Sequence, residues 1–265
     1  MSETSNQPEA TRVLADYIVA ACPEDLPEAV RLEALRSFVN IVGCMVGGAK
    51  HEAIGLADDV LVEFSGAPQA TLFGRDRKAD VLHATLINCF SSSVNAIDDT
   101  HNQAVVHPSG PVAAAALAMS ERKRVEGPEF LLAFALGVEA VCRLSKAISV
   151  PPAKELFAWS QTGVTAGVGA AVAAGKLLDL DAPRMRNAIG IALSQASGFR
   201  AMFGSMSSSL MTAHGAQTGL RAALLAEKGF TSSEAALAGP YGYFDVFTAH
   251  PHPEFLTGGL GNHFE

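Results

Sequence analysis

Charged and aromatic residues are both scarce in this sequence. Of its 265 residues, 17% are charged and 7% are aromatic, whereas 49% are hydrophobic. Lysine and arginine form no run and the net charge is −8, so the composition predicts binding neither to nucleic acid nor to an anionic membrane surface. With so little charge to cover helical surfaces, we expect much of the chain to be buried, part of it against a partner.

Cysteine is sparse, and its spacing forms no CxxC pair. Cys22, Cys44, Cys89 and Cys142 are scattered along the chain, which is typical of free thiols in a reducing compartment. The first residues, MSETSNQPEA, are polar and acidic, unlike a signal peptide. Gly, Ser or charged residues interrupt every apolar run before the roughly twenty positions that a membrane span needs. The sequence therefore predicts a soluble, cytoplasmic protein.

The motifs that carry common cofactor and nucleophile chemistry are missing. The sequence contains no GxxxxGK[ST], HExxH or GxSxG pattern. Gly167 and Gly169 resemble the start of a dinucleotide fingerprint, but Val172 stands where the third glycine belongs and no hydrophobic strand precedes them. Close helix packing is the favoured interpretation. His250 and His252 form an isolated pair near the end of the sequence, so a metal site there is the less favoured hypothesis.

Helical spacing of apolar residues runs through nearly the whole chain. One short extended piece is expected at residues 70–75. Helices are predicted over residues 11–21, 27–48, 51–64, 80–94, 111–119, 128–147, 161–180, 183–196 and 212–228. The prediction is one all-α domain over residues 1–265 with an irregular tail over residues 248–265. The small side chains of residues 161–180 would let backbones approach closely, so we expect that helix to be central.

The stretch NAIDDTHNQAVVHPSG, residues 95–110, concentrates the polar chemistry of the chain. It carries Asp98, Asp99, Thr100, His101, His107 and Ser109. Carboxylates that follow a helix oppose its dipole, which suggests that they serve another purpose. His107 is suited to move protons near neutral pH, and Ser109 is placed to cap the next helix. Residue types alone leave two interpretations open: a catalytic loop, and a loop held together by hydrogen bonds from Asp to the backbone.

Four segments carry a recognisable pattern: AIDDTHNQAVVHPSGPVAAAALA at 96–118, TGVTAGVGAAVAAGKLLDLD at 162–181, NAIGIALSQASG at 187–198 and GAQTGLRAALLAEKGFTSSEAALAGPYGYFDVF at 215–247. In these segments the sequence resembles the MmgE/PrpD family. Together they cover most of the chain from residue 90 onward. The helix pattern of the first 90 residues also fits this family.

The resemblance implies a helical first domain that holds most of the active site, and a smaller α+β lid domain that closes over it. Members are homodimers that need no metal or organic cofactor, and they add or remove water, carbon dioxide or a proton at carbons next to carboxylates. The lid is expected to be absent from residues 1–265. It is therefore either missing from the protein or carried by a further stretch or a separate chain.

The family's site residues carry over only in part. The loop keeps its DDTH and HPS elements, including His107, but Ala96 stands where the family pattern DxDDTH begins with Asp. Ser160 replaces the His of a W-H-x-T-G arrangement, and Ser208 replaces the Lys of a GSMSK arrangement. The serine run 205–209 also fits a helix cap. All three substitutions remove ionisable groups, and Ser160 and Ser208 in particular predict a less cationic site and a substrate with fewer carboxylates.

Two hypotheses follow. In the first, the protein is a cofactor-independent lyase or isomerase acting on a small substrate: His107 transfers protons, Thr100 and Asp99 orient it or the substrate, and the substrate is bound by Asp98, His101, Ser160, Gln161 and Ser208. In the second, it is a non-catalytic helical subunit that dimerises and takes its lid from a partner chain. The enzyme should have a cleft faced by the predicted residues, whereas in the scaffold Trp159, Phe203 or Met206 should fill that region.

Overall fold

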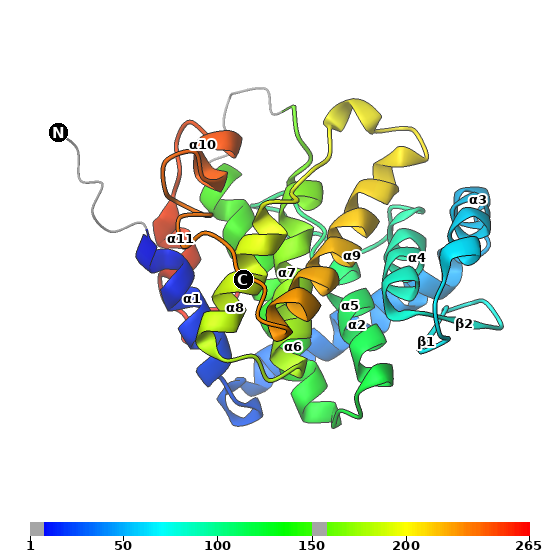
Figure 1. The fold of residues 1–265 in the computed structure, drawn as a ribbon, viewed down its shortest axis with the longest axis horizontal. Helices are drawn as coiled ribbons and strands as arrows, with labels where there is room; N and C mark the ends of the chain where they lie inside the picture. The colour runs from blue at the N-terminus through cyan, green and yellow to red at the C-terminus, as the bar shows by residue number, and fades with distance from the viewer. Residues whose placement is uncertain (1–7, 150–157) are drawn as a thin grey trace.

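The fold is built from helices joined by loops, with α7 in the middle (Figure 1). The computed structural model describes residues 8–149 and 158–265. The α-helices are α1 (Pro8–Ala20), α2 (Glu28–Gly48), α3 (Glu52–Leu61), α4 (Val81–Ser93), α5 (Ser109–Arg122), α6 (Gly127–Ser149), α7 (Gln161–Leu177), α8 (Ala182–Leu193), α9 (Ser207–Glu227), α10 (Tyr243–Phe247) and α11 (Pro253–Thr257). Short 3-10 helices are η1 (Pro23–Asp25), η2 (Val62–Phe64) and η3 (Arg200–Met202). Within the described ranges, none of these helices combines the length and apolar character needed to cross a membrane.

The predicted all-α class is confirmed. In the described part of the chain the regular strands are β1 (Ala70–Thr71) and β2 (Lys78–Ala79), which pair antiparallel. β1 lies where the sequence predicts one extended piece. The remaining described residues form helices and the connections between them, so the site described below is held entirely by helix ends and loops.

Polar side chains fix several helix starts by accepting hydrogen bonds from free backbone amides. Asp80 accepts from the amides of Leu82 and His83 at the start of α4, and Asp181 accepts from the amide of Arg184 at the start of α8. These aspartates explain why both helices begin close to the predicted positions.

The prediction that the serine run 205–209 caps a helix is wrong. Helix α9 begins at Ser207, well before the predicted residue 212, and its N-cap residue Met206 makes no side-chain cap bond. The hydroxyl of Ser205 donates instead to the carbonyl of Met202, and that of Ser209 donates to the carbonyl of Ser93 in α4. The serines therefore join neighbouring elements rather than cap α9.

Helix α7 is the centre of the packing, as the small side chains predict. It contacts α5, α6, α8 and α9. A Cβ atom at Gly219 of α9 would overlap the carbonyl oxygen of Gly167 in α7 and lie 2.7 Å from Cβ of Ala170. A Cβ at Gly169 would meet the backbone oxygen of Gly137 in α6 at 2.8 Å. The backbones of α6, α7 and α9 are therefore too close for larger side chains at these points.

The segment predicted as an irregular tail contains α11 and otherwise little regular structure. Buried Arg143 of α6 binds it by donating hydrogen bonds to the carbonyl oxygens of Phe255, Gly258 and His263 at 2.7–3.0 Å. The guanidinium also pairs with Glu139 one turn earlier on α6. The segment is thus attached to the core by charge-assisted hydrogen bonds.

We predict that Gly219→Ala destabilises the protein by about 1–3 kcal/mol or more, because its methyl group has no space against α7. Gly43→Ala is the matched control: it also lies inside a helix, but a Cβ there meets nothing within 4 Å. That change should raise the free energy of unfolding by roughly 0.5–1 kcal/mol, since alanine favours helix. Denaturant unfolding of both variants measures the difference, and equal effects would contradict the close packing.

Candidate active site

The loop between α4 and α5 carries most of the predicted site residues. Two of its non-glycine residues adopt left-handed backbone conformations, Ala96 with φ 52° and Val105 with φ 51°. Backbone hydrogen bonds between His101 and Val106, at 2.9 and 3.4 Å, close the turn. Left-handed conformations cost energy for residues with a Cβ and concentrate at functional sites. The loop therefore holds a defined shape that local preference alone would not give.

The imidazole of His107 is fixed through one of its nitrogens. Nδ1 lies 3.0 Å from the carbonyl oxygen of Asp99 and 3.2 Å from Oγ1 of Thr100. A carbonyl oxygen can only accept, so Nδ1 carries the hydrogen and Nε2 has the free electron pair. In the described residues no atom hydrogen-bonds to Nε2. The backbone amide of His107 donates to Oγ1 of Thr162 at 3.1 Å, which connects the loop to α7.

Two buried carboxyl groups lie beside His107. The side chain of Asp98 is only 3% exposed, and its Oδ1 lies 3.6 Å from His107 Nδ1. Burial raises the pKa of Asp98, while the neighbouring imidazole opposes that shift. Burial also raises the pKa of Asp99, although the hydrogen bond that Ser109 donates to its Oδ2 acts to lower it. Its Oδ1 has no hydrogen-bond partner among the described residues. Burying a carboxyl group at this cost beside an imidazole is typical of functional sites.

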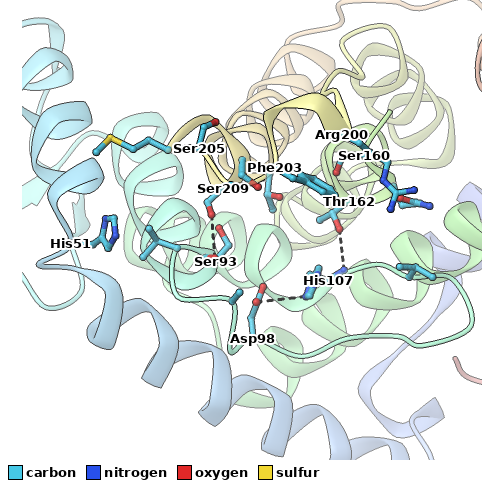
Figure 2. A pocket seen from close by; sticks show the side chains of 18 residues that line it. His51, Ser93, Asp98, His107, Ser160, Thr162, Arg200, Phe203, Ser205 and Ser209 are labelled. Atoms are coloured by element: carbon cyan, nitrogen blue, oxygen red, sulfur yellow. Dashed lines mark hydrogen bonds and ion pairs between the residues drawn. The ribbon is translucent and has the colours of Figure 1, made fainter. Parts of the chain in front are cut away.

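His107 and Asp98 border a cavity of about 620 Å³ between the α4–α5 loop, the N-terminus of α7 and the segment that runs from η3 into α9 (Figure 2). Its lining consists of His51, Ser93, Val94, Ala96, Asp98, Val105, His107, Ser160, Gln161, Thr162, Arg200, Phe203, Gly204, Ser205, Met206, Ser208, Ser209 and Thr212. This volume suits a small organic molecule. Phe203 and Met206 lie in the wall of this cavity, and their side chains do not fill it.

The predicted site residues divide into two groups. Asp98, His107, Ser160, Gln161 and Ser208 line the cavity, whereas Asp99, Thr100 and His101 do not. The hydroxyl of Thr100 and the backbone carbonyl of Asp99 hold the His107 ring through its Nδ1, away from the cavity. His101 turns away: its Nδ1 accepts from the amide of Ala104, and its Nε2 lies 3.2 Å from Oε2 of Glu265. The His101 side chain therefore contacts its own loop and Glu265, and not the cavity.

The N-terminus of α7 forms a neutral, polar wall. Ser160 caps the helix by accepting from the amide of Gly163 at 3.2 Å, and its own amide donates to the carbonyl of Gly198. Gln161 follows as the first helical residue, and both side chains are almost fully buried. Helix N-termini attract negative charge through their free amides and dipole. This wall therefore favours an anionic or hydrogen-bond-accepting group even without an imidazole at position 160.

The structure adds a cation that the sequence analysis missed. Arg200 of η3 lines the cavity, with its guanidinium carbon 5.7 Å from the ring centroid of Phe203. No carboxylate pairs with it in the described part of the chain, and its backbone amide is held by the carbonyl of Ala158 at 2.9 Å. A signal was available: Arg200 is the only Lys or Arg between Arg186 and Arg221.

His51 is a second imidazole at the cavity that the sequence analysis missed. It is the N-cap residue of α3, and its Nδ1 accepts from the amide of Ala53 at 3.1 Å. Nε2 therefore carries the hydrogen and can donate to a bound molecule. Figure 2 places His51 at the far side of the cavity from Arg200, so donors lie at both sides of the space. Nothing in the local sequence around His51 distinguishes it from an ordinary helix cap.

The metal hypothesis for the two late histidines gains no support. Within residues 8–149 and 158–265, no three His, Cys, Asp or Glu side chains are grouped so that they could hold a metal ion. His252 Nδ1 instead lies 2.9 Å from Oε1 of Glu254.

Comparison with known proteins gives a consistent family. A family model, the MmgE/PrpD N-terminal domain, matches residues 12–256. A cis-aconitate decarboxylase-like protein of Aspergillus oryzae is 25% identical over 284 residues, which cover 100% of this chain and 58% of that protein. Cis-aconitate decarboxylase of Aspergillus terreus is 28% identical over 229 residues, covering 83% of this chain and 46% of the relative. The Mus musculus cis-aconitate decarboxylase is 30% identical over 239 residues, which cover 87% of this chain and 48% of that protein. The chain thus spans about half the length of the curated relatives it matches.

We predict that Asp98→Asn raises the thermal midpoint at pH 7. The folded-state pKa of Asp98 is raised by burial, so above that pKa the ionised carboxylate costs stability, and below the pKa of the unfolded chain the cost is absent. The gain from Asn should therefore be present at neutral pH and shrink as the pH falls through the folded-state pKa. Asp59→Asn, at an exposed position on α3, serves as the control. A loss of stability at pH 7 would show that Asp98 is needed as an ionised partner of His107.

Proposed function

This chain belongs to the MmgE/PrpD family, and from that premise we propose that it is an acid–base enzyme, a lyase or isomerase that acts on a small carboxylate in the cavity beside His107. One observation carries the proposal: Nδ1 of His107 is held by the loop while Nε2 is left without a partner among the described residues, at a cavity of about 620 Å³. A fixed imidazole with a free electron pair is a competent general base near neutral pH.

In this proposal His107 Nε2 removes or returns a proton at a carbon next to a carboxylate. The Asp99 carbonyl and Thr100 orient the ring through Nδ1. Asp98, 3.6 Å from Nδ1, stabilises the imidazolium that forms when the base is protonated. The side chains of this chain supply the proton transfers, so the proposed reaction depends on no metal or organic cofactor.

The substrate carboxylate pairs with Arg200, and the N-terminal wall of α7 accommodates a second polar group. Arg200 supports this role because it lines the cavity without a carboxylate partner in the described residues. His51 donates from the other side through Nε2, and Ser208 supplies a hydroxyl where the family pattern has Lys. One guanidinium in the lining favours a substrate with fewer carboxylates than cis-aconitate, the compound in the names of the relatives.

A second candidate is a non-catalytic subunit of the same fold. Ala96, Ser160 and Ser208 favour it, because each occupies a cavity position where the family pattern carries an ionisable group. The open cavity favours the enzyme, because Phe203 and Met206 line the space without filling it. Trp159 lies outside the lining and packs edge-to-face on Phe247, with ring centroids 5.6 Å apart.

We also propose that the protein works as a cytoplasmic homodimer, with the lid supplied by a further stretch or a separate chain. Free cysteines support a reducing compartment. Exposed apolar side chains on α2 and α3 and in η2 support association, since such surfaces favour contact with a partner. They are Leu32, Leu35, Val39, Val46, Leu56, Val60, Val62 and Phe64.

A thermal-shift screen against mono-, di- and tricarboxylates, including cis-aconitate, tests the site. A ligand present at a hundred times its Kd should raise the midpoint of the parent protein by roughly 5–10 °C. His107→Ala should abolish most of this shift. His214→Ala, at an exposed position of α9 outside the cavity lining, should leave it unchanged. Absence of a shift with every acid, in a well-folded protein, would favour the non-catalytic candidate.

Arg200→Gln should weaken binding of the best carboxylate about 10- to 100-fold, because it removes a charge-assisted hydrogen bond. Arg36→Gln removes another exposed guanidinium, one that pairs with Glu33 on α2, and should have no effect. Calorimetric titration measures both. Equal affinities for the parent and Arg200→Gln would remove Arg200 from the substrate site.

A further inference from the structure

The loop that carries His107 is joined to a distant part of the chain by buried charges. Helix α6 presents Glu139, Arg143 and Lys146 toward the segment of residues 253–265, and all three side chains are buried. Burying charges is costly unless each one is paired. Losing a partner in that segment should therefore cost more stability than losing a surface ion pair would.

Glu265 is the residue at which these contacts meet. Its side chain is 7% exposed, and Oε1 accepts from Nζ of Lys146 at 2.6 Å. Its backbone amide donates to Oε2 of Glu139 at 2.8 Å. Burial acts to raise the pKa of Glu265, but the hydrogen bond and the charge of Lys146 outweigh it and lower the pKa, so the carboxylate is ionised at neutral pH. One oxygen of this carboxylate and the backbone amide of Glu265 are thus bound to α6.

The second oxygen reaches the active-site loop. Oε2 of Glu265 lies 3.2 Å from Nε2 of His101. Because Nδ1 of His101 accepts from the amide of Ala104, Nε2 carries the hydrogen and donates to the carboxylate. His101 also pairs with Val106 through both backbone hydrogen bonds, directly before His107. The His101 ring therefore connects the carboxylate to the turn that places His107.

We propose that Glu265 and His101 are positioning residues: the Glu265 carboxylate, anchored by Lys146, holds the His101 ring and so fixes the turn that directs His107 into the cavity. Neither residue lines the cavity, so they act through His107 and not on the substrate. Val105 within the turn adopts the left-handed conformation, which costs energy for a residue with a Cβ. The turn therefore depends on contacts of this kind. This proposal gives His101 a positioning role in place of the substrate binding that the sequence predicts.

The catalytic meaning of this contact rests on the proposed function, but its test does not need a substrate. Hydrogen exchange reports the opening of the turn through the amides of His101, Ala104 and Val106, whose hydrogen bonds lie within it. Ring NMR signals of labelled histidine report the hydrogen bond at His107 Nδ1. Thermal-shift data with carboxylates then test the link to ligand binding separately.

Glu265→Ala should speed exchange of these amides roughly tenfold, the effect of losing one charge-assisted hydrogen bond, and should shift the His107 ring signals. Glu254→Ala is the matched control, because that carboxylate lies in the same segment, is exposed and, among the described residues, pairs with its neighbour His252. It should change neither readout. If Glu265→Ala fails to fold, Glu265→Gln keeps the shape and removes the charge, and it should give a smaller change of the same sign.

A double-mutant cycle decides whether the effect passes through His101. His101→Gln alone and together with Glu265→Ala should speed exchange by the same factor, since the second change removes nothing further once the contact is gone. Additive effects would overturn the proposal. So would unchanged turn exchange and unchanged His107 signals in a Glu265→Ala protein whose global stability falls, because the segment would then serve only the overall fold. If instead the turn loosens but no carboxylate ever binds, the positioning contact stands and the proposed function fails.

Discussion

The close approach of α7 and α9 is the constraint on which the candidate site depends. Gly167 and Gly219 let the two helix backbones meet without side chains between them, and this contact fixes where the N-terminus of α7 begins. Ser160 and Gln161 then line the cavity from that end, and Thr162 holds the amide of His107. The geometry of the base therefore follows from helix packing far from the chemistry, because a displaced α7 would displace both walls of the cavity.

We infer that charge in the cavity is arranged differently from the family pattern that the sequence resembles. Ala96, Ser160 and Ser208 lie at the cavity without an ionisable side chain, and Arg200 and His51 bring a cation and a hydrogen-bond donor from other elements. Asp98 is buried beside the cavity, and this burial raises its pKa, which disfavours ionisation. A protein that needed only stability would replace such a carboxyl with a neutral group. Its retention beside a fixed imidazole is most simply explained by proton chemistry.

The sequence predicts the helices well because apolar spacing, proline and small residues act locally, and the central place of residues 161–177 follows from their size alone. It also locates the loop of residues 95–110 from residue types. What the sequence leaves out involves distant partners. It suggests His101 as a substrate ligand, but the structure places that ring outside the cavity lining and beside Glu265, far along the chain. Ser109 was expected to cap α5, but it donates to Asp99 instead. Arg200 and His51 reach the cavity only through tertiary packing, which no local pattern encodes.

The most direct measurement of the central claim is deuterium incorporation by NMR. The protein is incubated in D₂O with the small carboxylates that it binds, and the carbons next to their carboxylates are followed. Decarboxylation and epimerisation place a solvent hydrogen on such a carbon, and dehydration does so when the proton is returned in the reverse step. The account therefore predicts deuterium there in substrate or product, and its loss with His107→Gln. Binding of a carboxylate without any incorporation, or incorporation that survives His107→Gln, would contradict the assignment of His107 as the base.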